Sequence, residues 1–283
     1  MKNCLKAKAH QSPSDALFIY YIEGVIHPAT TISHPAFKGN WIEDESTFLF
    51  FSEPADETVK MVCNGLSHLR LMDRFEMSYD EWQGGAHEPF QAGGLTVVPF
   101  RTEAPPSRPA GTREIFLDPG VVFGNGAHPT TRCCLEILSK MGPSLSSKTV
   151  QDLGTGTGLL ALGAARLGAS KVLAVDLNHL AVVTAKRNVW VNGLSHRILP
   201  VQGDAQEMIH APADLLLANI HFDIMKKIVA TKGFAQKKEA ILSGLLTQES
   251  RLIKSYVTEL GFHVAQHLSP DGIWHTFHLQ KRG

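Results

Sequence analysis

The stretch from Thr149 to Leu160, TVQDLGTGTGLL, constrains the fold of this chain more than any other. Two β-branched residues lead into Asp152, three glycines then alternate with threonines, and an apolar run suited to a helix follows. Glycine has no Cβ, so the chain can turn sharply and a ligand can approach the backbone amides. The helix that follows presents unpaired N–H groups at its start. The stretch therefore predicts a strand, a ligand-binding loop and a helix in succession.

The chain after this loop alternates regularly between strand-like and helix-like patterns. Strands are expected at 171–175, 198–202, 214–220 and 239–243, with helices between them. Such alternation predicts a parallel sheet with helices on both faces. Two final apolar runs, 262–268 and 273–280, flank the four turn residues SPDG and predict an antiparallel β-hairpin.

A second glycine-rich loop precedes the first. It runs from Gly120 to His128, and Pro129 and Thr130 after it are favourable residues for starting a helix. This loop is placed to clasp a ligand from the side opposite to Gly154. His128 is expected either to order the loop or to touch a substrate.

The N-terminal part has a different organisation. Residues 1–88 are expected to form a small α+β domain, in which strands near 17–22, 46–51 and 69–77 surround a helix that starts at Asp56. Residues 89–113 are interpreted as a linker region, because 101–113 concentrate Pro, Gly, Ser and charged residues. The ligand-binding domain would then comprise residues 114–283.

Composition narrows the classes of partner. Lys plus Arg and Asp plus Glu both number 27, so no bulk positive field favours direct nucleic-acid binding. The four cysteines form no CxxC pair, and the histidines of the terminal hairpin lack a cysteine or carboxylate at metal-binding spacing, so no metal site is predicted. The apolar run at 16–22 is too short for a membrane span. A reduced, cytoplasmic location is expected.

The glycine spacing distinguishes between cofactors. A dinucleotide fingerprint would require glycine at position 159, which is Leu. The G-x-G-x-G arrangement instead resembles the loop of class I S-adenosylmethionine (SAM) methyltransferases, and their fold also ends in an antiparallel strand. Asp176 ends the second strand, where a carboxylate can accept both hydroxyls of an adenosine ribose. Asp204 and Asn219 follow at the next two strand ends.

A more specific resemblance rests on the second loop. The segment LDPGVVFGNGAHPTT (117–131), together with LLANI (216–220), ILSGLL (241–246) and Trp274, is similar to the PrmA family, methyltransferases that act on amino groups of a large-subunit ribosomal protein. The resemblance begins at about Trp82. It implies a Rossmann-like class I fold, and an N-terminal domain that recognises the protein substrate. Asn125 departs from the family, which usually has Thr there.

The resemblance also implies which residues bind the cofactor. Positions that match the family's SAM contacts are Thr131, Gly154, Asp176 and Asn219. Motif logic adds Gly156, for close approach of the backbone, and Asp204, for the adenine amino group. Asn219 is in addition the expected catalytic residue, because an uncharged acceptor can hold the hydrogens of a neutral amine while its lone pair faces the methyl group.

The leading interpretation is therefore a SAM-dependent methyltransferase of protein amino groups, on a lysine side chain or an N-terminus, with a ribosomal protein as a possible substrate. One alternative keeps the cofactor but places the methyl group on nucleic acid or a small molecule. Another is a non-catalytic SAM-binding domain that serves as an interaction module.

Overall fold

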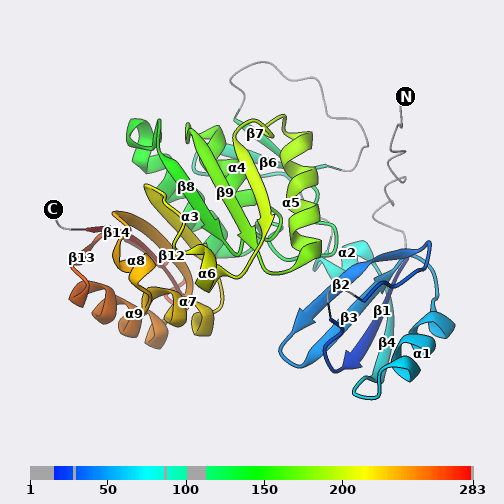
Figure 1. The fold of residues 1–283 in the computed structure, drawn as a ribbon. Helices are drawn as coiled ribbons and strands as arrows, with labels where there is room; N and C mark the ends of the chain where they lie inside the picture. Colours follow the sequence, from blue (N-terminus) through cyan, green and yellow to red (C-terminus); the bar gives the residue numbers. More distant parts are fainter. Residues whose placement is uncertain (1–15, 28–29, 86–87, 101–112, 282–283) are drawn as a thin grey trace, which may run out of the picture. The chain divides into compact units, whose positions relative to one another are not determined.

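The computed structural model describes residues 16–27, 30–85, 88–100 and 113–281. By their contacts these residues separate into two compact units, residues 16–85 and residues 88–100 with 113–281, which are described separately below (Figure 1). Most of the residues interpreted as connector, 101–112, lie outside the described part of the chain.

The first unit is a four-stranded antiparallel sheet in the order β2-β3-β1-β4. Its strands are β1 (Ala16–Glu23), β2 (Phe37–Glu43), β3 (Ser46–Phe51) and β4 (Arg70–Ser78), and its helices are α1 (Asp56–Gly65) and α2 (Tyr79–Trp82). One sheet face and α1 enclose a core to which Phe18, Tyr20, Ile22, Leu49, Phe51 and Val59 contribute. The Ala55 N–H, at the start of α1, donates to the buried Tyr20 hydroxyl at 2.7 Å, which fastens the helix to the sheet.

Strand β2 lies between the first two predicted strands, in a segment for which no strand is predicted. Its sequence FKGNWIE mixes polar and apolar residues, every residue is at least partly exposed, and its register shifts at Gly39. An edge strand of this kind carries no alternating apolar pattern, since neither of its faces is fully buried.

The second unit is built on a seven-stranded sheet in the order β10-β9-β8-β11-β12-β14-β13. The first five of these strands are parallel, and the last two are antiparallel. They are β8 (Thr149–Leu153), β9 (Lys171–Asp176), β10 (Ile198–Gln202), β11 (Leu215–Asn219), β12 (Glu239–Leu246), β13 (Phe262–Leu268) and β14 (Trp274–Lys281). The predicted parallel sheet and terminal hairpin are thus confirmed.

Helices cover both faces of this sheet (Figure 1). Successive side chains of each strand point to opposite faces of the sheet, and both faces are buried. Val150, Leu215 and Leu217 pack on one face, and Leu153, Leu216 and Ala218 pack on the other. The first face carries α3 (Pro129–Met141), α4 (Leu159–Arg166) and α5 (His179–Val191). The second carries α6 (Ala205–Met208), α7 (Phe222–Val229), α8 (Lys232–Ala235) and α9 (Thr247–Glu259).

A small three-stranded sheet replaces part of the expected linker. Strands β5 (Phe90–Ala92) and β6 (Leu95–Pro99) form a hairpin, and β6 pairs in parallel with β7 (Glu114–Leu117). The turn residues Gly93 and Gly94 both have positive φ, 57° and 67°. Two consecutive glycines here make a tight hairpin turn, not a flexible connector. Leu95, Val97 and Ile115 join the core beneath α3 and α4.

The second unit therefore has the mixed α/β fold of class I methyltransferases, and the first unit adds a separate antiparallel sheet. Among the described residues, no helix combines the length and apolarity that crossing a membrane would require.

Candidate active site

The polar residues singled out in the sequence gather at one edge of the large sheet. Strands β8, β9, β10 and β11 run parallel, so their carboxyl ends meet at this edge. The glycine loop follows β8, Asp176 ends β9, Asp204 comes two residues after β10, and Asn219 ends β11. Open α/β sheets bind ligands at this edge.

The first glycine loop, residues 154–158, is folded by backbone hydrogen bonds to the neighbouring strand. The N–H groups of Gly154 and Thr155 both donate to Val175 O at 2.9 Å. Gly154, Gly156 and Gly158 have φ values of 72°, 54° and 84°, a left-handed conformation that residues with a Cβ adopt only under strain. A Cβ at Gly156 would in addition lie 2.7 Å from Phe123 O, so the loop has no room for a side chain there.

The carboxylate of Asp176 holds this loop by accepting backbone hydrogen bonds. Its Oδ2 accepts the Gly156 N–H and its Oδ1 accepts the Asn178 N–H, both at 2.9 Å. Burial raises the pKa of Asp176, and these two hydrogen bonds oppose part of that increase. A carboxylate offers about four acceptor positions, so two remain for the paired hydroxyls of a ribose. The orientation of Asp176 therefore fits the adenosine part of SAM.

Asp152 is the second acidic group of the loop. Its side chain is 1% exposed, and its Oδ2 accepts the Thr155 hydroxyl at 2.7 Å. Burial raises the pKa of Asp152 to about 6, with the nearby charge of Asp176 contributing in the same direction. The site thus concentrates two poorly solvated carboxylates, which suits a cationic ligand such as the sulfonium cofactor.

The second loop, residues 120–128, lies directly against the first. The Thr157 hydroxyl donates to Gly124 O at 2.7 Å, and the Phe123 carbonyl faces Gly156. Phe123 itself is 66% exposed. The two glycine loops are thus in contact.

Buried asparagines of α5 hold the base of the second loop. Asn188 accepts the Asp118 N–H at 3.0 Å and donates to Asp118 O and Thr157 O, both at 2.9 Å, so it bridges the two loops. Asn192 pairs in the same way with both backbone groups of Phe116. Neither asparagine stands out in the sequence, because polar residues within a predicted helix usually face solvent.

Asn219 and Thr131, which the resemblance names as SAM contacts, are hydrogen-bonded to each other. Asn219 Nδ2 donates to Thr131 Oγ1 at 3.4 Å, joining the end of β11 to the first turn of α3. With the amide nitrogen turned to Thr131, the Asn219 Oδ1 remains as an acceptor. A Cβ on Gly244 of β12 would come within 3.1 Å of that oxygen. Gly244, at φ 84°, is therefore a supporting residue that the sequence pattern did not single out.

His128 orders the second loop. It is the N-cap of α3, with Nδ1 2.7 Å from the Thr130 hydroxyl, and its ring packs edge-on against Trp274 at 4.8 Å. Burial lowers the pKa of His128, and the charge of Asp271 acts in the opposite direction. These contacts cap α3 at the end of the loop and tie the loop to the terminal hairpin; a contact of His128 with substrate stays a prediction.

The residue before Asp204 is hydrogen-bonded to Asp176: the Gly203 N–H donates to the Asp176 backbone O at 3.0 Å. Its own carboxylate caps α6 by accepting the Gln206 N–H at 2.7 Å. A direct contact of Asp204 with the adenine amino group stays a prediction. Within the described part of the chain, no three His, Cys, Asp or Glu side chains group closely enough to hold a metal ion.

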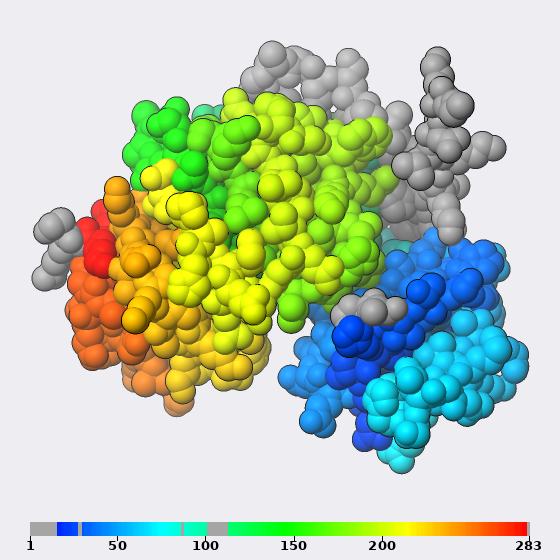
Figure 2. Space-filling view, in the orientation of Figure 1, coloured from blue at the N-terminus to red at the C-terminus, as the bar shows by residue number. Residues whose placement is uncertain are grey.

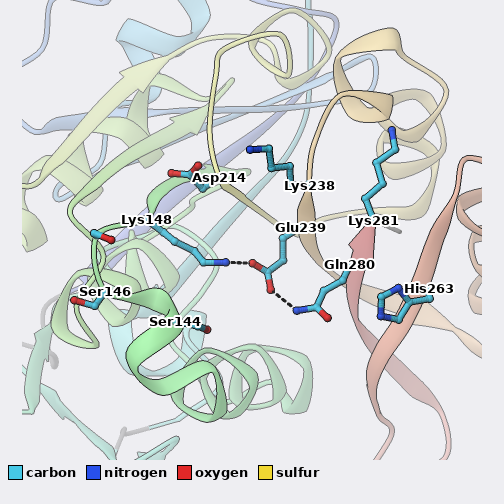
Figure 3. A pocket seen from close by; sticks show the side chains of 10 residues that line it. Ser144, Ser146, Lys148, Asp214, Lys238, Glu239, His263, Gln280 and Lys281 are labelled. Carbon is cyan, nitrogen blue, oxygen red and sulfur yellow. Dashed lines mark hydrogen bonds and ion pairs between the residues drawn. The ribbon is translucent and has the colours of Figure 1, made fainter. Parts of the chain in front are cut away.

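A cavity of about 480 Å³ lies elsewhere, at the amino ends of the parallel strands (Figure 3). There Glu239 bonds to Lys148, Gln280 and His278. Burial raises the pKa of Glu239, but hydrogen bonds from His278, Lys148 and Gln280 outweigh it and lower the value to about 2. His278 is 4% exposed, and its Nε2 lies 2.7 Å from Glu239 Oε1. The network fastens β12 to β14 and serves stability.

Comparison with known proteins agrees with the fold and with the family that the sequence resembles. The model of the family "Ribosomal protein L11 methyltransferase (PrmA)" matches residues 57–282. A ribosomal protein L11 methyltransferase of Limosilactobacillus reuteri is 36% identical over 64% of this chain, and the match spans 56% of that protein. One from Streptococcus equi subsp. zooepidemicus is 31% identical over 81% of this chain and 76% of that protein.

Among solved structures, the ribosomal protein L11 methylase from Lactobacillus delbrueckii subsp. bulgaricus superimposes with a TM-score of 0.55 and 26% identity. The superposition covers 66% of this chain and 95% of that one. The extent of the family match and the geometry of the paired loops lead to one assignment: the chain belongs to the ribosomal protein L11 methyltransferase (PrmA) family of SAM-dependent methyltransferases.

Proposed function

We propose that this protein transfers methyl groups from SAM to amino groups of a protein, with ribosomal protein L11 as the substrate. The relatives named above carry that substrate in their names. Asn219 is the observation that carries the proposal. It ends a buried strand beside the paired loops, and its amide is oriented by Thr131. A ribosomal substrate also implies action in the cytoplasm.

The chemical demand on the site is a neutral amine. SAM, when bound, supplies an electrophilic methyl group on a sulfonium. A lysine with a pKa of about 10.4 costs roughly 4–5 kcal/mol to deprotonate at neutral pH. Asn219 Oδ1 accepts a hydrogen bond without adding charge, so it orients the amine without favouring the ammonium form. Positioning of this kind supplies much of the rate in a displacement that needs no covalent step on the enzyme.

The other site residues hold the cofactor in this proposal. The glycine loop offers backbone N–H groups, Asp176 accepts the ribose hydroxyls, and Asp204 binds the adenine amino group. Thr131 contacts the methionine part from the start of α3. The first unit, which the resemblance relates to a substrate-recognition domain, would select the protein to be methylated.

Methylation with radiolabelled SAM tests the substrate class. The purified full chain is incubated with recombinant ribosomal protein L11 and, separately, with total RNA and a small-molecule extract. Label in L11 is expected. Label confined to RNA or to metabolites would replace the protein substrate, and SAM binding by calorimetry without any transfer would indicate a non-catalytic module.

Asn219→Asp tests the catalytic role. The two side chains have the same shape, but the carboxylate stabilises the ammonium form of the substrate, so kcat is expected to fall by about 10²-fold. SAM affinity should change much less, because the substituted group remains an acceptor. Asn178→Asp is the matched control: Asn178 caps α5, where a carboxylate is equally favourable. An unchanged kcat in Asn219→Asp would contradict the role.

A further inference from the structure

Charge is distributed very unevenly along this neutral chain. Residues 16–85 contain eleven Asp and Glu against four Lys and Arg, whereas the whole chain has 27 of each kind. These residues form the first unit, coloured from blue to cyan in Figure 2. An excess of negative charge on one unit draws cationic partners towards it and repels nucleic acid.

The sheet of this unit has two different faces. One is buried against α1, as described above. On the opposite face the rings of Tyr21 and Phe48 stack at 5.1 Å with an interplanar angle of 13°. Trp41 is in register beside Phe48, and Phe75 is in register beside Ile19, two residues along β1 from Tyr21. Tyr21, Trp41, Phe48 and Phe75 are here called the aromatic face.

The aromatic face is open to solvent along part of its length. Trp82 of α2 packs edge-on against Phe50 at 5.2 Å and covers the neighbouring part of the sheet, where Leu17 and Ile19 are buried. Beyond it, Tyr21, Trp41 and Phe48 are only half-buried, and Phe75 is 39% exposed. A contiguous set of partly exposed aromatic side chains is suited to contact with a partner.

Carboxylates border these rings. Side chains alternate along a strand, so Glu23, Glu43 and Asp73 lie on the same side of the sheet as Tyr21, Trp41 and Phe75. All three carboxylates are exposed. Glu23 forms an ion pair with Arg70 at 3.0 Å, and Arg70 is the basic residue closest to them in the register.

We propose that the aromatic face and these three carboxylates bind a lysine-rich segment of the methyl-accepting protein. The proposal rests on the proposed function, because it assigns the segment to the substrate of the same enzyme. Ammonium groups bind over aromatic rings and beside carboxylates, so the surface matches lysine side chains in both respects. RNA is repelled by the acidic border, and a second copy would bring two acidic faces together.

Most of this surface precedes the segment that the family model matches. That match begins at residue 57, whereas Tyr21, Trp41, Phe48, Glu23 and Glu43 all come before it.

Binding of a fluorescent octalysine peptide to the full chain tests this surface without SAM or turnover. The double variant Glu43→Lys/Asp73→Lys reverses two exposed charges of the border and should weaken octalysine binding about tenfold at low salt, with less effect at high salt. Glu53→Lys/Glu57→Lys is the matched control. It makes the same change of net charge in the chain segment that leads into and begins α1, and should change binding less than about twofold.

Phe48→Leu tests the rings separately. It keeps an apolar side chain in the sheet and removes one ring, so binding should weaken by about two- to fivefold with unfolding temperature largely retained. Equal losses in both double variants would reduce the effect to net charge and overturn the proposal, as would octalysine binding that no variant changes. Because methylation of L11 is measured separately, its failure would overturn the proposed function while leaving a specific octalysine effect interpretable.

Discussion

The two glycine loops of the site reach the same place by different means. The first, 154–158, is folded by its own backbone and the adjacent strand, through the paired N–H bonds to Val175 O. The second, 120–128, is held mainly by side chains from elsewhere in the sequence, above all Asn188 and Thr157. The glycines of the first loop lie against neighbouring atoms and leave little room for a Cβ, whereas the second loop depends on side chains that lie far away in the sequence.

The largest effect is expected where the loops touch. Gly156→Ala places a Cβ 2.7 Å from Phe123 O and forces alanine to a φ of 54°. Strain of about 1–2 kcal/mol adds to an overpacking cost of about 1–3 kcal/mol, and SAM affinity should fall by at least about 100-fold. Calorimetry with SAM and thermal unfolding measure the two effects.

Gly261→Ala separates strain from contact. Gly261 has a φ of 87°, but a Cβ there would meet no atom within 4 Å. This variant should lose only the strain energy and keep SAM affinity. If both alanine variants bind SAM equally well, the contact between the loops has no part in the cofactor site.

The dependence of the second loop on distant partners is tested by Asn188→Leu. The substitution leaves Asp118 N–H, Asp118 O and Thr157 O without their bonds to Asn188, which is itself fully buried. At about 1–3 kcal/mol for each buried group left unpaired, we expect a loss of about 4 kcal/mol in the free energy of unfolding. Urea unfolding measures it.

Val183→Ala on the same helix is the control, because Val183 is 46% exposed and its truncation should cost less than about 0.5 kcal/mol. A loss in Asn188→Leu no larger than in this control would mean that the asparagine bridge does not hold the loop.

How far each loop could be predicted follows from the same difference. The first loop can be predicted from a short stretch of sequence, because the strand, the three glycines and the helix are contiguous. Asp176 and Asn219 can be predicted as well, because each is a polar residue at the end of an apolar strand. The two asparagines that anchor the second loop lie about 70 residues from the backbone groups they bind. Nothing in the helical pattern of α5 distinguishes Asn188 from a solvent-facing asparagine, so only the fold reveals it.

The same reasoning explains the two corrections of the fold. Gly93 and Gly94 fall within the predicted linker region, 89–113, although the composition that predicts a connector is confined to 101–113. In the structure they form the turn between β5 and β6, and β6 in turn pairs with β7 from beyond the connector. Strand β2 forms because its backbone pairs with the edge of β3. Its own sequence lacks the alternating apolar pattern that predicts a strand. Local patterns predict elements that bury a face, and edge elements depend on their neighbours.

Each glycine loop is preceded by an acidic residue, and the two residues, Asp152 and Asp118, differ in their surroundings. Asp152 is buried with its pKa raised to about 6, whereas Asp118 forms an ion pair with Arg187 at 3.2 Å. A carboxyl group whose pKa is raised by folding stabilises the fold fully below pH 4, and this contribution is lost as the pH rises through 6. The loss amounts to about 3 kcal/mol for a shift of this size.

Asp152→Asn removes that pH dependence. Compared with the unmodified chain, the variant should gain stability between pH 4.5 and pH 7.5, as followed by urea unfolding at both values. Asp118→Asn should be destabilising at both, because it strips Arg187 of its partner. A stability difference for Asp152→Asn that stays constant with pH would show that Asp152 is charged throughout this range in the folded protein.

The smallest effect is expected at Asn125 of the second loop, where the resemblance implies a threonine. Asn125 Oδ1 accepts the Ala127 N–H at 2.9 Å, a local turn that a threonine hydroxyl can also form, though more weakly. Asn125→Thr should therefore change the free energy of unfolding by less than about 0.5 kcal/mol, whereas Asn125→Ala, which cannot form the turn, should cost about 0.5–1.5 kcal/mol. Both are read from urea unfolding with SAM affinity measured in parallel. A larger loss in Asn125→Thr than in Asn125→Ala would mean that the asparagine does more than close this turn. The second loop would then be adapted to its neighbours in this chain beyond the anchors on α5.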